Sequence, residues 1–69
     1  MGDQNPLPDD LAAFLLLHAT VSARDEDATR QVLRFTAETL PEAQGHKVAT
    51  QLYNSISGGS RMWLQNKLY

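Results

Sequence analysis

The sequence predicts an all-α protein: a small three- to four-helix bundle that is dimeric. Apolar residues recur at the 3.6-residue spacing of helices, and no segment shows the alternation of a strand. A 69-residue chain buries only about 60% of its unfolded surface, so a lone core yields roughly 3–5 kcal/mol. No cysteine is present to form a disulfide. Pairing with a second copy is therefore the expected source of further stability.

The chain is expected to form one domain. Residues 1–6 are polar and are interpreted as a flexible N-terminal lead. Residues 7–69 are interpreted as a single helical domain. Its helices are expected at about 9–23, 26–38, 40–57 and 61–69.

The first expected helix, residues 9–23, is apolar nearly all round. Asp9 and Asp10 open it, where carboxylates interact favourably with the positive end of the helix dipole. One stripe at helical spacing contains Leu11, Phe14, Leu15, His18 and Ser22. A helix of this kind needs cover on more than one side, and a second copy is the simplest additional cover.

His18 lies in the middle of that stripe. We expect a partly buried imidazole that is hydrogen-bonded to a neighbour. The alternative is a pH-sensitive group at a subunit interface, where protonation would oppose assembly.

The second expected helix, residues 26–38, is amphipathic and has an acidic first turn. No Gly or Pro separates it from the first helix, so one continuous helix from Asp9 to Glu38 is the alternative. We favour a break near Ser22 to Asp25, because this polar cluster is typical of helix caps and a tight turn.

The third and fourth helices are separated by Ser57-Gly58-Gly59-Ser60. Thr39 and Glu42 match a capping box, which would begin the third helix. The Gly pair is expected to be a flexible joint, with Ser60 capping the last helix. The last segment is too short to be helical unless it docks on another surface.

Charge is distributed unevenly along the chain. Residues 1–43 contain all eight acids and three arginines, whereas residues 44–69 contain three bases and no acid. The second half also carries aromatic and amide side chains, a composition that suits nucleic acid. The candidate contacts are Lys47, Arg61 and Lys67. Three cations are few, since specific DNA-binding proteins commonly make about 6–10 phosphate contacts.

A protein interface is the favoured use of the apolar residues. On the first helix the candidates are Phe14, Leu16, Leu17 and His18; near the C-terminus they are Arg61, Met62, Trp63, Leu64 and Tyr69. Aromatic residues, Met and Arg are enriched at interface hot spots. For Trp63 and Leu64 the competing interpretation, that they complete the core of the domain, is the one we favour.

No catalytic, cofactor or metal site is expected. The acidic clusters lie at helix starts, where dipole effects explain them, and a chain of this size offers little interior for a desolvated active site. The two histidines lie in separate helices without sulfur ligands. The uncharged stretch 11–23 is too short for the roughly 30 Å core of a bilayer. We expect a cytoplasmic protein that is not an enzyme and has no contact with membranes.

The sequence therefore predicts a small non-catalytic protein-binding module. It would be a homodimer and would act as a regulator or inhibitor by covering a surface of a larger protein partner. One alternative is a small DNA-binding transcriptional regulator that uses the basic C-terminal half. Another is a structural or secretion-machinery subunit.

Overall fold

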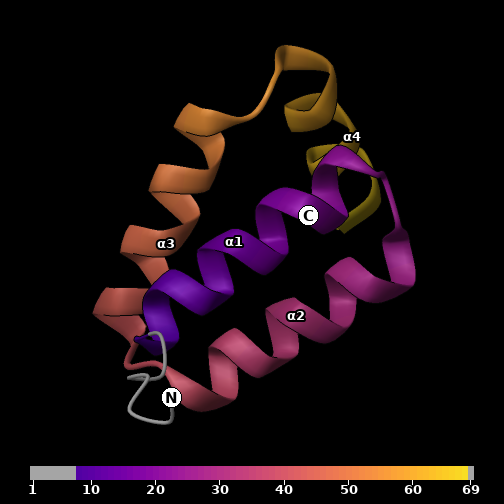
Figure 1. Cartoon of the computed structure of the whole chain (residues 1–69). Coiled ribbons are helices and arrows are strands. Elements are labelled where there is room, and N and C mark those ends of the chain that lie inside the picture. Colours follow the sequence, from indigo (N-terminus) through magenta and orange to yellow (C-terminus); the bar gives the residue numbers. More distant parts are fainter. Residues whose placement is uncertain (1–7, 69) are drawn as a thin grey trace, which may run out of the picture.

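The computed structural model describes residues 8–68, and these form four helices (Figure 1). The helices are α1 (Asp9–Ser22), α2 (Glu26–Thr39), α3 (Glu42–Ser55) and α4 (Gly58–Leu68). No strand occurs within the described range. The all-α prediction is confirmed. The expected N-terminal lead, residues 1–6, lies outside the described residues, as do Leu7 and Tyr69.

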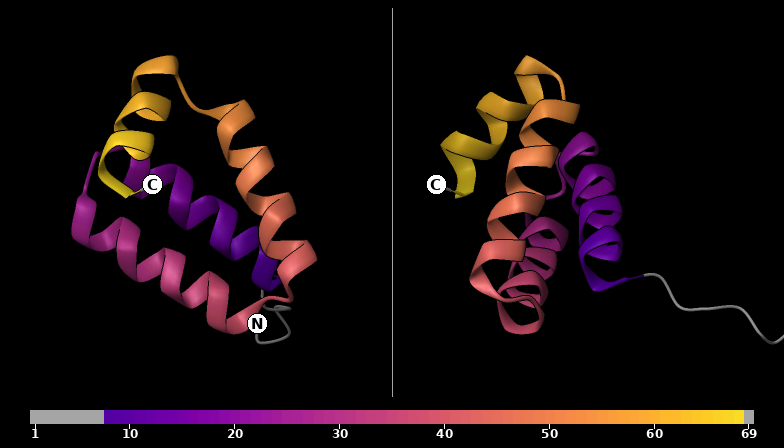
Figure 2. Two further views of the ribbon diagram at one scale, coloured as in Figure 1. Left: turned by 180° about the vertical axis from the view of Figure 1, so that it is seen from behind. Right: turned by 90° about the vertical axis from the view of Figure 1, so that its left-hand side faces the viewer.

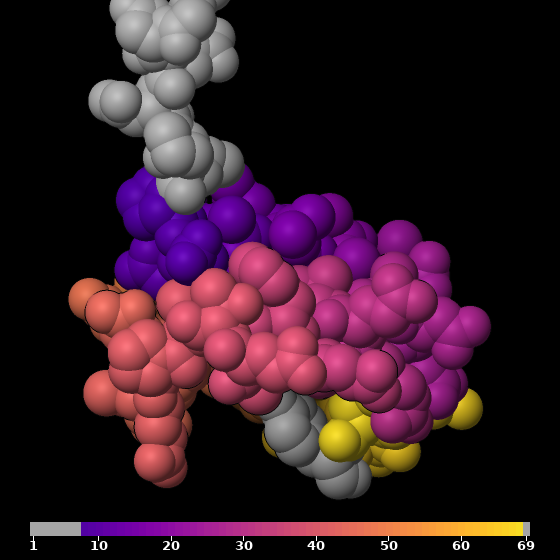
Figure 3. Space-filling view, turned by 90° about the horizontal axis from the view of Figure 1, so that it is seen from below, coloured from indigo at the N-terminus to yellow at the C-terminus, as the bar shows by residue number. Residues whose placement is uncertain are grey.

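Helix α1 packs against both α2 and α3, while α4 packs against α1 and α2. Helices α2 and α3 diverge from the turn that joins them (Figure 1). Seen from the side, α1 and α4 lie at opposite edges of the bundle, with α3 and α2 in the middle of the view (Figure 2). From below, α2 separates most of α1 from α4 (Figure 3). This arrangement leaves one face of α1 and one face of α4 turned toward solvent in opposite directions.

The core is centred on α1. Its members are Ala13, Leu17, Val21, Leu40, Val48, Leu52, Ile56 and Leu64. The buried row of α1 is thus Ala13, Leu17 and Val21, and the stripe that begins with Leu11 lies outside it. Because α1 is apolar on every side, its sequence does not determine which face the bundle buries.

The break between α1 and α2 is confirmed, and it is made by Arg24. Arg24 has a positive φ of 55°. Its N–H donates to the Val21 carbonyl at 3.0 Å, and the Asp25 N–H donates to the Thr20 carbonyl at 3.0 Å. These two bonds form a Schellman motif, which usually places Gly at the left-handed position. The Asp25 carboxylate then caps α2 by accepting from the Ala28 N–H at 3.1 Å.

The predicted capping box at Thr39 and Glu42 is wrong. Thr39 is the last residue of α2, and Pro41 precedes α3 without a side-chain cap. Pro41 disfavours helical backbone at Leu40 before it, so Leu40 is extended and ends α2. The Leu40 side chain is buried in the core, which fixes this turn.

The predicted glycine joint is wrong as well. Gly58 and Gly59 form the first turn of α4 instead of a linker before it. Ser57 acts as the cap in place of Ser60: its hydroxyl oxygen accepts from the Ser60 N–H at 3.2 Å. Ser60 is buried. The helix therefore starts earlier than expected, because the hydroxyl that caps it lies three residues upstream of Ser60.

Candidate protein-binding surface

The outward side of α1 carries an apolar surface, which we call the α1 outer face: Leu11, Leu15, Leu16 and Ala19. The leucines are 41%, 48% and 49% exposed, in that order. Ala19 is exposed too. No charged residue occurs between Asp10 and Arg24. The buried row of α1 faces α2 and α3, so the outer face has no cover from the described part of the chain.

Phe14 and His18 border the α1 outer face. Both are half-buried. Their ring centroids are 5.9 Å apart with a tilt of 45° between planes. This separation is within the range of favourable aromatic pairs. Leu16, Phe14 and His18 are thus at least partly accessible, as an interface would require.

Two of the expected interface residues are core residues. Leu17 is 2% exposed and Leu64 is 1% exposed, so neither can meet a partner while the bundle stays folded. Trp63 is partly buried and packs against the core, which matches the alternative that it completes the domain. Tyr69 lies outside the described residues.

The outward side of α4 is polar and basic around one apolar side chain. Met62 is 64% exposed. Arg61, Gln65 and Asn66 are also exposed. Together these four residues make what we call the α4 outer face. The Arg61 guanidinium donates to the Ile56 carbonyl at 3.3 Å, which holds it near the start of the helix.

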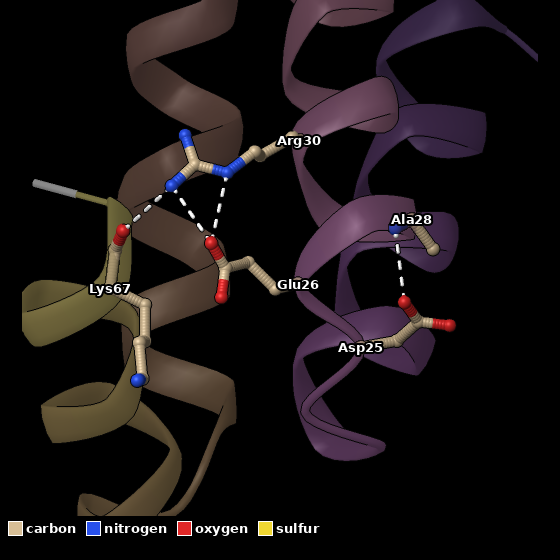
Figure 4. A network of polar contacts seen from close by, with 5 residues as sticks. All are labelled: Asp25, Glu26, Ala28, Arg30 and Lys67. Atoms are coloured by element: carbon tan, nitrogen blue, oxygen red, sulfur yellow. Dashed lines mark hydrogen bonds and ion pairs between the residues drawn. The ribbon is translucent and has the colours of Figure 1, made fainter.

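Two arginines from the first half of the chain are directed toward α4. Arg30 donates to the Lys67 carbonyl at 3.1 Å and forms an ion pair with Glu26 at 2.9 Å (Figure 4). Arg24 Nη2 lies 3.0 Å from the position that a Cβ at Gly59 would occupy. Neither contact could be predicted from the sequence, because each joins residues more than thirty positions apart.

The three expected nucleic-acid contacts do not share one helix. Arg61 and Lys67 lie on α4, whereas Lys47 lies in the half of α3 away from α4 (Figure 1). All three side chains are exposed. Lys47 is therefore remote from α4, whereas Arg24 and Arg30, which were not among the expected contacts, lie beside α4.

A groove that sequence reasoning missed lies between α2 and α3, with a volume of about 180 Å³. It is lined by Leu17, Leu33, Thr36, Ala37, Gly45, Val48, Ala49, Leu52 and Tyr53. Small residues at 37, 45 and 49 leave this space where the two helices diverge. The small residues are visible in the sequence, but they predict a groove only once it is known that α2 and α3 face each other.

The described residues contain no group of three or more His, Asp or Glu side chains arranged to hold a metal ion. No helix within residues 8–68 has the length and hydropathy that crossing a membrane requires. Comparison of the chain with models of known protein families, with curated proteins and with solved structures finds no match.

Proposed function

We propose that this chain is a cytoplasmic, non-catalytic protein-binding module. It associates with a second copy of itself, and it regulates or inhibits a larger protein by covering part of that protein's surface. The observation that carries the proposal is the α1 outer face, where three neighbouring leucines are each almost half exposed.

Scattered exposed apolar residues are ordinary on protein surfaces, but a contiguous apolar patch indicates an interaction site. Leu11 and Leu15 are four positions apart, about one helical turn, and Leu16 follows Leu15 directly, so the three leucines are contiguous on one side of α1. Covering a half-exposed leucine contributes roughly 1 kcal/mol, so the three together contribute about 3 kcal/mol to a complex. The absence of charge between Asp10 and Arg24 means that a partner need not desolvate an ion there.

The test is recovery of the partner from the native host with tagged protein, followed by an affinity measurement. The variant Leu15→Gln with Leu16→Gln removes the apolar character of the face without adding charge. We expect it to bind the recovered partner at least tenfold more weakly. The matched control is Gln51→Glu on the exposed side of α3, which should bind as the unmodified chain does. Equal binding by the α1 variant, with circular dichroism showing an intact fold, would refute the proposal.

DNA binding is the second candidate, and the gathering of cations around α4 favours it. Arg24 and Arg30 reach α4, which itself carries Arg61 and Lys67. Contacts to phosphates release counterions, so binding would fall steeply with salt. A DNA-binding function predicts salt-sensitive retention on DNA that is lost in Arg61→Ala with Lys67→Ala. The protein-binding function predicts that this double variant still binds the recovered partner.

A further inference from the structure

We propose that copies of this chain associate head to tail, with the α1 outer face of one copy resting on the α4 outer face of the next. The inference rests on the self-association in the proposed function and specifies its geometry. It also bears on the structural-subunit alternative, because a contact between two different faces leaves a free face at each end to which further copies can add.

The two faces are flanked by opposite charge. Asp9 and Asp10 lie at one end of α1, and Asp25 and Asp27 follow its other end, all at least partly exposed. The two arginines nearest to that second end have partners elsewhere: Arg24 Nη2 lies close to Gly59. Arg30 pairs with Glu26 and donates to the Lys67 carbonyl (Figure 4). The unpaired charges at the two ends of α1 are therefore those of aspartates.

The α4 side carries the complementary charge. No acid occurs in the chain after Glu42. Arg61 and Lys67 are exposed on α4, and the guanidinium group of Arg24 adds positive charge near Gly59. The Arg30 guanidinium also lies beside α4, but its charge is balanced by Glu26. Complementary potentials steer association and fix which faces meet. An α1 outer face flanked by acids thus fits an α4 outer face flanked by bases.

Pairing of α1 with α1 is disfavoured by the same charges. In an antiparallel pair, Asp9 and Asp10 of one copy would lie near Asp25 and Asp27 of the other. In a parallel pair, each acidic end would lie beside its own duplicate. Like charges opposite each other weaken an interface and select against that partner. A contact between α1 and α4 avoids both arrangements.

The two faces point in opposite directions, so one copy can use both at once. Figure 2 shows α1 and α4 on opposite sides of the bundle, and Figure 3 shows the same separation from below. A contact between two different faces leaves a free α1 outer face at one end and a free α4 outer face at the other. Such heterologous contacts extend into rows of copies unless the rotation closes a ring.

The expected contact is weak and reversible. Met62 supplies the apolar centre on α4, and its flexible side chain can fill the space between leucines of α1. One helix of 14 residues against one of 11 residues covers a strip only about 17–21 Å long at 1.5 Å per residue. A strip of that length and one helix wide, about 10 Å, buries well under the roughly 1,200 Å² of stable complexes. The flanking charges should therefore contribute measurably to the affinity.

The decisive experiment is sedimentation of two variants, alone and mixed. Leu15→Gln with Leu16→Gln disables the α1 outer face, and Arg61→Gln with Met62→Gln disables the α4 outer face. The unmodified chain should show an average mass that rises with concentration beyond two copies. Each variant alone should remain monomeric. Their equimolar mixture should form a complex of two chains and grow no further, since each variant keeps the face that the other lacks.

Lys47→Gln on α3 is the matched control for removing a cation, and it should assemble as the unmodified chain does. Raising the salt concentration from about 0.05 M to 0.5 M should weaken association several-fold, because exposed charges are screened. Circular dichroism establishes that each variant is folded.

Two results would overturn the inference. A closed dimer that persists in the α4 variant would mean that α1 pairs with α1; self-association would then stand while the head-to-tail geometry fails. A chain that stays monomeric to millimolar concentration would exclude self-association altogether. Binding to a larger partner is judged separately, by the affinity of the α1 variant for that partner.

Discussion

Arg24 adopts the left-handed backbone that divides α1 from α2, with φ of 55°. A side chain in this conformation costs roughly 1 kcal/mol, which Gly avoids. We expect Arg24→Gly to be more stable than Arg24→Ala by about 1 kcal/mol, because both lose the side chain and only Gly relieves the strain. Urea unfolding of the two variants measures the difference. Equal midpoints would show that the turn is not strained.

Thr29 is completely buried, and its hydroxyl has no hydrogen-bond partner among the described residues. Leaving a buried hydroxyl unpaired costs about 1–3 kcal/mol. Thr29→Val keeps the shape and removes that group, so the free energy of unfolding should rise by about 1 kcal/mol. Thr36→Val is the control, since the Thr36 hydroxyl donates to the Val32 carbonyl at 2.8 Å. We expect no gain there, and thermal unfolding of both variants decides the matter.

At the scale of the element, α3 contains Gly45 within its first turns. A Cβ at this position would meet nothing closer than Thr36 Cγ2 at 4.0 Å, which is ordinary contact. Gly45→Ala should therefore stabilise the protein by up to about 1 kcal/mol, the cost of Gly in a helix interior. Gly59→Ala is the comparison, because its Cβ would lie 3.0 Å from Arg24 Nη2 and would displace it. A destabilised Gly45→Ala in chemical denaturation would contradict this account.

The helix starts show how far local chemistry predicts an element. Asp25 caps α2 as the polar cluster suggested, because the cap and the residues it serves are neighbours in sequence. Thr39 and Ser60 each match a capping pattern equally well, yet one ends α2 and the other lies inside α4. In both places the observed helix boundary is the one that buries a side chain: Leu40 at the end of α2 and Ser60 within α4. Local capping patterns alone do not contain this information.

At the scale of the whole molecule, α4 is expected to be part of the cooperative fold. Leu64 is 1% exposed and joins α4 to the core. Leu64→Ala should cost about 2–5 kcal/mol, which is comparable with the roughly 3–5 kcal/mol that a core of this size supplies. We therefore expect a largely unfolded chain by circular dichroism at 25 °C. Met62→Ala, 64% exposed on the same helix, should change stability by less than about 0.5 kcal/mol. A folded Leu64→Ala would show that α4 docks only loosely.

The candidate surface was only partly predictable from sequence. The composition of α1 correctly indicated more apolar area than the bundle covers, since this depends only on the residues present. Which leucines remain outside could not be predicted: Leu16 and Leu17 are adjacent, yet one is 49% exposed and the other 2%. The orientation of α1 is set by its contacts with α2 and α3, which involve residues distant in the chain.

The sequence by itself determined the all-helical class, the break between α1 and α2, and the excess of apolar surface on α1. Each follows from short-range spacing and composition, which act within a few residues. The tertiary structure decided which side of α1 is buried, that the Gly pair belongs to α4, and that Arg24 and Arg30 are directed toward α4. These outcomes depend on packing and charge between distant segments, and such contacts exist only once the chain has folded.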